Sequence, residues 1–330
     1  MPWIVRRAQA GRFADPGERG YAVQDPRALF TLSDDQPGPE EFDRPVLLHV
    51  LNGFIDAGFA GKLAGDHLLQ TLQHRVLATF DVDQLYDYRA RRPPMTFVED
   101  HWESYEAPEL VLRMAEDAAG RPFLMLTGPE PDVQWERFVA AVQHLVEQYD
   151  VRLAVGIHAI PMAVPHTRPA GITAHATRRE LIADHPTWLG RVQVPGNISG
   201  LLEFRLGQAG RDAGGFAVHV PHYLAQTEYP DAGAALLEAV NKLSGLSLPT
   251  EGLMLAGAQT RAAIEEQIAG QPEVEAVVHA LEQQYDAFVA ARGNALPLAD
   301  DTAELPTADE LGAELERFLA EENERRGRGE

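Results

Sequence analysis

Residues 46–61 read VLLHVLNGFIDAGFAG, and this stretch decides the fold class. Its first six residues form a nearly continuous apolar run, which is typical of a strand that is covered on both faces. The following residues, among them Asn52, Gly53 and Asp56, favour a turn. Leucines then recur at helical spacing over residues 58–72. The stretch therefore predicts a buried strand, a turn and an amphipathic helix, the repeating unit of α/β proteins.

The same alternation continues towards residue 221. Short apolar runs predict further strands at 75–80, 110–114, 123–127, 153–157, 171–174 and 216–220. Apolar residues at helical spacing after Asp132 predict a helix that this residue caps. Because strands of this kind need helices on both faces, we expect an α/β sandwich on a largely parallel sheet.

The two ends of the chain differ from this central region. Residues 1–44 mix Gly, Pro and acidic residues around Ala28-Leu29-Phe30, which predicts an arm with one edge strand. Beyond residue 250 the strand patterns stop, Pro272 opens an amphipathic helix, and Thr307 with Glu310 fits a capping box for a final helix. We expect an α/β core domain with its N-terminal arm over 1–250 and a helical C-terminal extension over 251–330.

The composition excludes several classes of function. The formal charge is −22, from 50 acidic and 28 basic residues, and this excess disfavours binding to nucleic acid or to anionic membranes. The chain contains no cysteine, which excludes disulfides and thiolate chemistry. We see neither a signal peptide nor an apolar run of about 18 residues, so the cytoplasm is the expected compartment and no membrane partner is expected.

The glycine-rich turn after the first strand raises the question of phosphate binding. The dinucleotide pattern G-x-G-x-x-G would place Asp56, Gly58 and Gly61 at its three glycine positions, and the P-loop pattern also puts Asp56 at its first glycine. A carboxylate there would repel a phosphate. We therefore expect no cofactor at this turn and a structural role for Asp56 as a helix cap. The location stays a candidate ligand site, because α/β sheets bind ligands beyond the carboxyl ends of their strands.

Other chemistry-bearing residues match no complete motif. The spacing of the histidines fits no metal site, and Ser199 lies one residue away from the nucleophile position of G-x-S-x-G and more naturally begins a helix. The segment 86–94 is locally basic and aromatic, and we expect an exposed loop there. We assign no catalytic, cofactor-binding or metal-binding residue. Seven residues are candidates for a strand-end cleft or an interaction surface: Asn52, Asp56, Asp81, Asp83, Arg89, His158 and His166.

Together, several short motifs resemble the proteasome assembly chaperone family in its bacterial, actinobacterial-type branch. They are NGFIDAG at 52–58, FDVD at 80–83, TGPEP at 127–131, the loop 157–168, AHAT at 174–177 and VPHYL at 220–224. The resemblance covers roughly residues 45–290, and its specificity comes from the order of the motifs.

This resemblance implies a three-layer α/β/α sandwich with phosphorylase/hydrolase-like topology, usually without catalytic residues and assembled as a homo-oligomer. It also implies a protein partner, since family members in eukaryotes and archaea bind proteasome α-subunits and guide ring assembly. Some members end in a hydrophobic-Tyr-X tail that docks on those subunits. The last residues here, ERRGRGE, do not match that tail.

Two hypotheses follow. The first is a non-enzymatic assembly-chaperone-like protein that binds other proteins, with proteasome α-subunits as candidate partners. The second is a phosphorylase- or hydrolase-like enzyme, or a small-molecule-binding protein, that uses the strand-end cleft.

Overall fold

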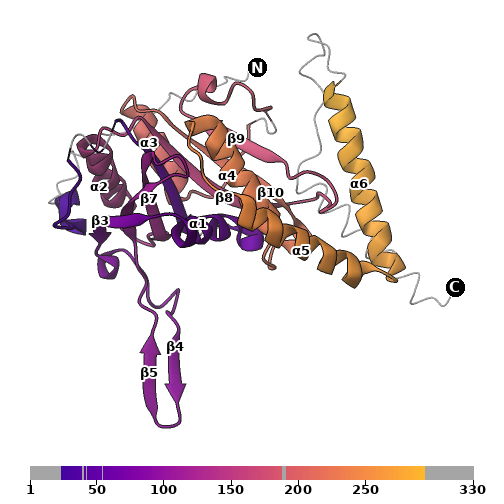
Figure 1. Ribbon diagram of the computed structural model, residues 1–330, viewed down its shortest axis with the longest axis horizontal. Coiled ribbons are helices and arrows are strands. Elements are labelled where there is room, and N and C mark those ends of the chain that lie inside the picture. Colours follow the sequence, from indigo (N-terminus) through magenta and orange to yellow (C-terminus); the bar gives the residue numbers. More distant parts are fainter. Residues whose placement is uncertain (1–23, 39–40, 42, 54, 188–190, 294–330) are drawn as a thin grey trace, which may run out of the picture. The chain divides into compact units, whose positions relative to one another are not determined.

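In the residues that the computed structural model describes (24–38, 41, 43–53, 55–187 and 191–293), eight strands form one mixed sheet in the order β1-β3-β6-β7-β2-β8-β10-β9 (Figure 1). The strands are β1 Phe30–Leu32, β2 Val46–Asn52, β3 His74–Phe80, β6 Val111–Glu116, β7 Pro122–Pro129, β8 Leu153–Met162, β9 Ile172–Ala176 and β10 Ala213–Pro221. A separate two-stranded sheet pairs β4 Met95–Val98 with β5 His101–Tyr105.

The sheet is parallel at its centre and antiparallel towards its edges. The pairs β7–β2, β2–β8 and β8–β10 are parallel, whereas the pairs β1–β3, β3–β6, β6–β7 and β10–β9 are antiparallel. The expectation of a largely parallel sheet therefore holds only for the four central strands. The reason lies in a short connection: only residues 117–121 link β6 to β7, and such a link joins antiparallel neighbours, whereas a parallel pair needs a crossover of a dozen residues or more.

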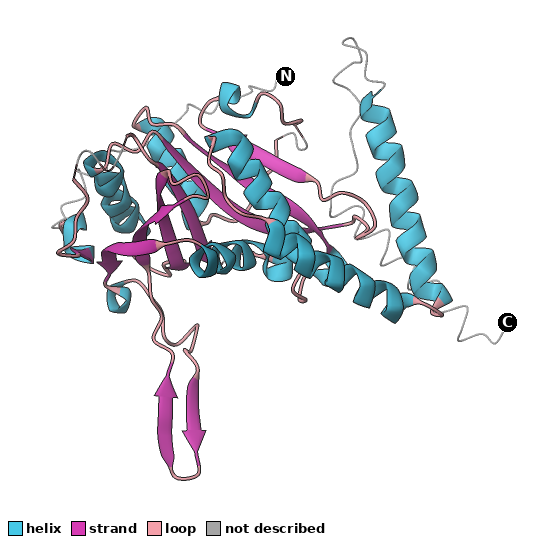
Figure 2. Cartoon of the chain, in the orientation of Figure 1, coloured by secondary structure: helices cyan, strands magenta, loops and turns pink. Residues whose placement is uncertain are grey.

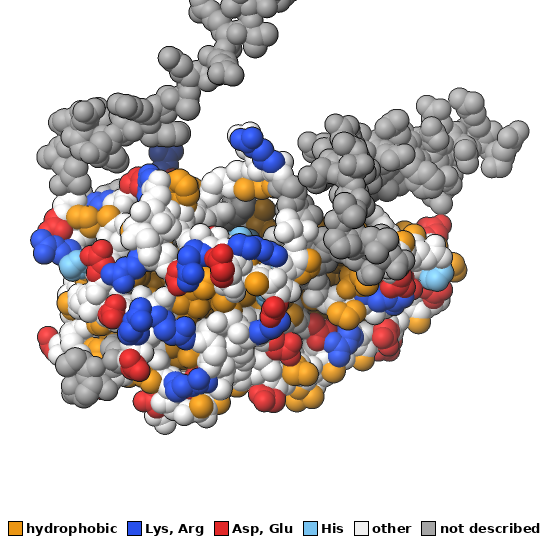
Figure 3. All heavy atoms as spheres, turned by 90° about the horizontal axis from the view of Figure 1, so that it is seen from above, with side chains coloured by type: hydrophobic (Ala, Val, Ile, Leu, Met, Phe, Trp, Pro, Cys, Tyr) orange, Lys and Arg blue, Asp and Glu red, His pale blue; other side chains and the backbone are white. Residues whose placement is uncertain are grey.

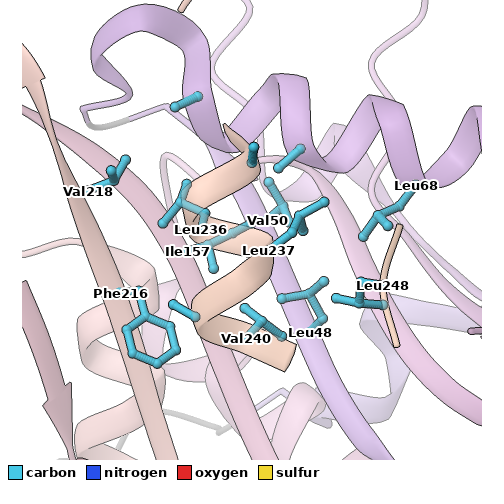
Figure 4. Packing of buried hydrophobic residues seen from close by; sticks show 14 of the residues in the cluster. Leu48, Val50, Leu68, Ile157, Phe216, Val218, Leu236, Leu237, Val240 and Leu248 are labelled. Atoms are coloured by element: carbon cyan, nitrogen blue, oxygen red, sulfur yellow. The ribbon is translucent and has the colours of Figure 1, made fainter. Parts of the chain in front are cut away.

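Helices cover both faces of the sheet, which confirms the three-layer α/β/α arrangement (Figure 2). The helices are α1 Ala60–Thr71, α2 Trp135–Gln148, α3 Ile198–Gln208, α4 Pro230–Ser244, α5 Glu251–Ile268 and α6 Pro272–Gly293. Side chains alternate along each strand, so Leu48 and Val50 of β2 face α1 and α4, while Leu47 faces α2 and α3. Figure 4 shows Leu48 and Val50 packed with Leu236, Leu237 and Val240 of α4.

The start of α1 shows how the opening stretch of sequence builds the fold. The carboxylate of Asp56 accepts hydrogen bonds from the backbone N–H groups of Gly61 (2.8 Å) and Lys62 (2.9 Å). This confirms the expected cap. Gly58 has a φ of 64°, and a Cβ there would lie 2.8 Å from the Cβ of Tyr229, so the turn requires glycine.

The local expectations have different outcomes. Asp132 does not cap α2: its carboxylate accepts from the N–H of Asp87, and Gln134, in a left-handed conformation, precedes the helix. β4 and β5 were not predicted. The edge strand of the N-terminal arm is confirmed as β1, two residues after the expected start, while the helix expected from the Thr307–Glu310 capping box lies outside the described residues.

The chain divides into two compact units, residues 1–282 and 283–330. In the first unit, α5 packs against α4 and α1. The division into domains at residue 250 stays a prediction. None of the helices in the described part is both long and apolar enough to cross a membrane.

Candidate functional site

The C-terminal ends of β3, β7, β2, β8 and β10 lie along one edge of the sheet, and the sequence candidates follow or lie in three of these strands. Neighbouring strands are about 4.8 Å apart, so the three steps from β3 to β2 span roughly 14 Å. The structure consequently distributes the seven candidates along the edge in separate groups.

Arg91 organises the polar groups at the ends of β2 and β7. Its guanidinium donates to the carbonyl oxygens of Asn52 (3.2 Å) and Glu130, and it forms an ion pair with Asp132 at 2.7 Å. It also lies over the ring of Tyr86, 4.6 Å from the centroid. The cation at this place is therefore Arg91, whereas Arg89, the arginine expected from the sequence, is exposed. Three arginines occur within four residues of one loop, and only the folded loop decides which points inwards.

Glu130 links this group to the next helix. Its carboxylate accepts from the N–H of Ile198, the first residue of α3, at 2.6 Å. Burial raises the pKa of Glu130, while the bond from Ile198 and the nearby Arg91 act in the opposite direction. The side chains of Arg91 and Glu130 therefore bind backbone groups at the ends of β2 and β7 and at the start of α3.

Asp81 and Asp83 lie beyond β3 and line an open cavity of about 660 Å³. Asp81 accepts from Gln84 at 2.7 Å, and Asp83 accepts from the hydroxyl of Tyr88 at 2.6 Å, which raises the pKa of Tyr88. Arg113 lines the same cavity and donates to the hydroxyl of Thr127 at 2.8 Å. Sequence reasoning missed Arg113, because it lies inside a strand whose neighbour across the sheet is set by the fold.

Asp56 is engaged in the cap of α1. Burial raises the pKa of its carboxyl group, although the bonds from Lys62 and Gly61 favour the charged form. Asp56 also forms an isolated bridge with Ala159 of β8. It therefore joins two parts of the fold.

His158 belongs to a cluster of imidazoles on the side of the sheet that faces α3. One row across four strands reads His49, Gly156, Gly215 and His175. The two glycines make room for the rings: a Cβ at Gly156 would lie 2.5 Å from Cε1 of His49, and one at Gly215 would clash with the ring of His175. The ring of His158 lies 6.2 Å from that of His175, measured between centroids.

Polar side chains from α3 reach the imidazoles of this row. Nδ1 of His175 is 2.7 Å from a carboxylate oxygen of Glu203, and Nδ1 of His49 is 3.4 Å from the hydroxyl of Ser199. Burial lowers the pKa of both His49 and His158 to about 4. The distance between Ser199 and His49 is longer than that of a nucleophile and its base. Within the described residues, no group of three or more His, Asp or Glu side chains could hold a metal ion.

His166 lies in the loop after β8, apart from the other candidates. Its ring Nδ1 and its backbone nitrogen are 2.7 and 2.9 Å from the hydroxyl of Tyr223. The next residues of the loop contact α6, where Arg168 pairs with Glu282 at 3.2 Å. Burial lowers the pKa of His166. These contacts give the loop a structural connection to α6.

Exposed apolar side chains gather on α5 and the start of α6. Met254 and Leu255 are 51% and 65% exposed. Further along, the end of α5, the start of α6 and residues 222–227 line a groove of about 510 Å³, which we call the α5–α6 groove. Its apolar lining consists of Leu224, Ile264, Ile268, Val274, Val277 and Val278. Apolar surface of this kind is typical of sites that bind other proteins. On the face shown in Figure 3, by contrast, Lys and Arg side chains lie among acidic and hydrophobic ones.

Comparisons with known proteins agree on one family. The model of the PAC2 family matches residues 50–268. A Mycobacterium tuberculosis protein of unknown function is 47% identical, with a TM-score of 0.77, over 85% of this chain and 96% of that one. A Corynebacterium glutamicum protein of unknown function is 36% identical, with a TM-score of 0.75, over 80% and 99%.

A proteasome-assembly chaperone homologue from M. tuberculosis is more distant. It is 25% identical, with a TM-score of 0.64, over 68% of this chain and 96% of that one. No curated protein matches this chain.

Proposed function

This chain belongs to the PAC2 family, and on that premise we propose that it is a non-enzymatic, assembly-chaperone-like protein that binds proteasome α-subunits in the cytoplasm. The observation that carries the proposal is the family match over residues 50–268, and it is supported by the likeness of 68% of this chain to a proteasome-assembly chaperone homologue. This family match supports the resemblance to the proteasome assembly chaperone family that was inferred from the order of the sequence motifs.

The geometry of the strand ends supports a role without catalysis. Asp56 caps α1, Glu130 accepts from the first N–H of α3, and Arg91 donates to carbonyl oxygens. These polar groups hold the polypeptide backbone, whereas a catalytic group would be directed at a substrate.

We assign two apolar surfaces to the partner, the α5–α6 groove and the exposed pair Met254 and Leu255 near the start of α5. An assembly factor must bind an unfinished partner better than the finished one, so its selectivity is a difference between two affinities. An apolar face meets this need, because the subunits of an unfinished complex expose apolar surface that the finished complex buries.

The test is native mass spectrometry of the full chain co-expressed with the proteasome α-subunits of the same organism. We expect a defined complex of the two proteins, and we expect Met254→Asp with Leu255→Asp to reduce its amount at least tenfold. Gln208→Asp, an exposed position at the end of α3, is the matched control and should leave the complex intact. An unmodified chain that forms no complex with the α-subunits would contradict the proposal.

One observation favours a second candidate, a small-molecule-binding protein or enzyme. Arg113 and Thr79 line the 660 Å³ cavity together with Asp81, Asp83 and Glu109. The three carboxylates disfavour a phosphate and favour a cationic ligand. A thermal-shift screen with nucleosides, phosphate, small peptides and divalent metals tests this candidate, and a flat result would count against it.

A further inference from the structure

The strand β9 forms one edge of the eight-stranded sheet, where it pairs with β10 alone (Figure 1). The backbone N–H of His219 donates to the carbonyl oxygen of Gly171, and that of Thr177 donates to Ala213, both at 2.8 Å. Because such bonds alternate along an antiparallel pair, every second residue of β9 directs its N–H and C=O groups away from β10. Within the described residues, these outward groups have no hydrogen-bond partner. They belong to Ile172, Ala174 and Ala176.

The outer edge of β9 lacks the side chains that usually protect a sheet edge. Proteins keep edge strands from pairing by making them very short, by placing charged residues or proline in them, or by covering them. β9 reads ITAHA and contains no Lys, Arg, Asp, Glu or Pro. The opposite edge strand, β1, has only three residues, and Asp34 and Asp35 follow it closely. The edge of β9 is therefore the one that another strand can join.

A groove between β9 and α3 lies beside this edge. His175 and Thr177 on one side, with Glu203 and Phe204 of α3 on the other, line a volume of about 400 Å³, which we call the β9–α3 groove. The helix packs close to the strand, since a Cβ at Gly207 would lie 2.9 Å from Cγ2 of Thr177. Side chains alternate along a strand, so a strand added to β9 would direct every second side chain towards this groove.

The lining of the β9–α3 groove favours a basic side chain. Among the described residues that line it, Glu203 is the one acid, and there is no lysine or arginine. Nδ1 of His175 contacts one carboxylate oxygen of Glu203 at 2.7 Å, which leaves the other oxygen for a ligand. Phe204 is 58% exposed. A lysine or arginine can lay its apolar stem on such a ring and place its charge against the carboxylate.

The charges around the groove do not compete with this carboxylate. Arg178 and Arg205 are each held in an ion pair with an acid, at 2.6 and 2.5 Å. Beyond the end of β9, the adjacent Arg179 and Glu180 carry opposite charges. The side chains on the other face of β9 are apolar, and Ile172 packs against the hydrophobic cluster under α1 and α4. An added strand would therefore be basic on one face and apolar on the other.

We infer that β9 binds an extended segment of another protein as an added strand. Lysine or arginine at alternate positions of this segment faces the β9–α3 groove, and apolar residues face the opposite side. Main-chain hydrogen bonds to the free edge supply affinity, and the groove supplies specificity. The net charge of −22 also attracts a basic segment. A second copy of β9 would bring no lysine or arginine to the groove, so the sequence of the strand argues against self-pairing.

Fluorescence anisotropy with the full chain tests the proposal. The labelled probe is the peptide TRVRVRT, in which arginines alternate with valines, and the control peptide TEVEVET carries glutamate in their place. We expect saturable binding of the probe. The control peptide should bind at least about tenfold more weakly, because its carboxylates meet Glu203.

Two variants locate the binding site on β9 and α3. Ala174→Pro removes an N–H group from the outer edge, where proline is tolerated because β10 does not use that group, and it should abolish binding. Glu203→Gln should weaken binding about tenfold, since a charge-assisted hydrogen bond is lost. Glu238→Gln, at an exposed position on α4, removes the same charge elsewhere and should leave binding unchanged. Thermal unfolding checks that each variant is folded.

N-methylation of the probe tests strand pairing without any change to the protein. Only every second N–H group of an added strand points at β9. Methylation of one set of backbone nitrogens, either those of the valines or those of the arginines, should therefore abolish binding. Methylation of the other set should preserve it.

Three results would overturn the proposal. The first is the absence of saturable binding of TRVRVRT, and the second is an equal effect of the two methylation patterns. The third is a changed oligomeric state of folded Ala174→Pro in analytical ultracentrifugation, which would show that a second copy occupies the edge. All three are distinguishable from failure of the proposed function, because binding of α-subunits is measured separately and is assigned to α5 and α6.

Discussion

His49 lies on β2 with its imidazole against Gly156 and its Nδ1 towards Ser199. Burial, together with the positive charge that His175 and His158 would carry, lowers its pKa to about 4. An unfolded chain binds the proton near pH 6.5, so between pH 6.5 and 4 the unfolded state holds more protons than the folded state. The stability that neutral His49 contributes is complete above pH 6.5 and is lost as the pH falls towards 4.

We expect the free energy of unfolding, measured with urea, to fall as the pH decreases from 7 to 5. His49→Gln should remove about 1 kcal/mol per pH unit of that slope, since one proton then no longer binds on unfolding. His74→Gln, at the exposed start of β3, is the matched control for the effect of replacing a histidine by glutamine. An unchanged slope in His49→Gln would show that His49 is already protonated in the folded protein at pH 5.

Asp56 supports a second prediction about a single side chain. It accepts from two backbone N–H groups at the start of α1 and is partly buried, so Asp56→Ala should lower the free energy of unfolding by about 1–2 kcal/mol. Asp66→Ala removes an exposed ion pair with Lys62 on the same helix and should cost less than about 0.5 kcal/mol. Chemical denaturation measures both. Equal losses in the two variants would contradict the capping role.

The contact between α4 and α5 depends on a close approach at Gly257. A Cβ at this position would lie 3.2 Å from the backbone nitrogen of Asp231 and closer still to its carboxylate, which pairs with Arg261. Gly257→Ala must therefore push aside the Asp231 carboxylate that pairs with Arg261, and it crowds the backbone of α4.

We expect Gly257→Ala to cost about 1–3 kcal/mol and to speed amide hydrogen exchange in α5. Ala263→Ser, exposed on the same helix, should change neither quantity. If exchange in α5 stayed as slow as in the unmodified protein, the helix would tolerate the added methyl group and the predicted contact would be wrong.

The two hydrophobic clusters of the described chain lie on opposite faces of the same sheet. Leu48 belongs to the cluster under α1 and α4, and Phe138 of α2 belongs to the opposite one. Because Leu47 and Leu48 are neighbours in β2 and serve different clusters, neither layer should unfold alone.

Leu48→Ala and Phe138→Ala should each cost about 3 kcal/mol and lower the temperature of one shared calorimetric transition. Met254→Ala, at an exposed position, should have a much smaller effect. A separate early transition in either core variant would show that the two layers unfold independently.

Several helices and strands of this protein, one helix cap and its family could be predicted from local sequence patterns. The run 46–51 became β2, the segment 58–72 holds α1, and the helix after residue 272 is α6, because the period of apolar residues reports which faces are buried. Asp56 was identified as a cap because a cap acts within a few residues of itself. The family was identified from the order of short motifs, and the match over residues 50–268 confirms it.

The tertiary structure alone decided how distant residues meet. The row of His49, Gly156, Gly215 and His175 exists only through the pairing of four strands, and no local pattern encodes that register. The choice of Arg91 over Arg89 follows from the folding of their loop, and the spread of the strand-end candidates along one sheet edge follows from strand order. The buried face of a helix or strand can be predicted because its apolar residues recur with a fixed period within that element. The alignment of strands cannot, because it depends on contacts between segments that are far apart in the chain.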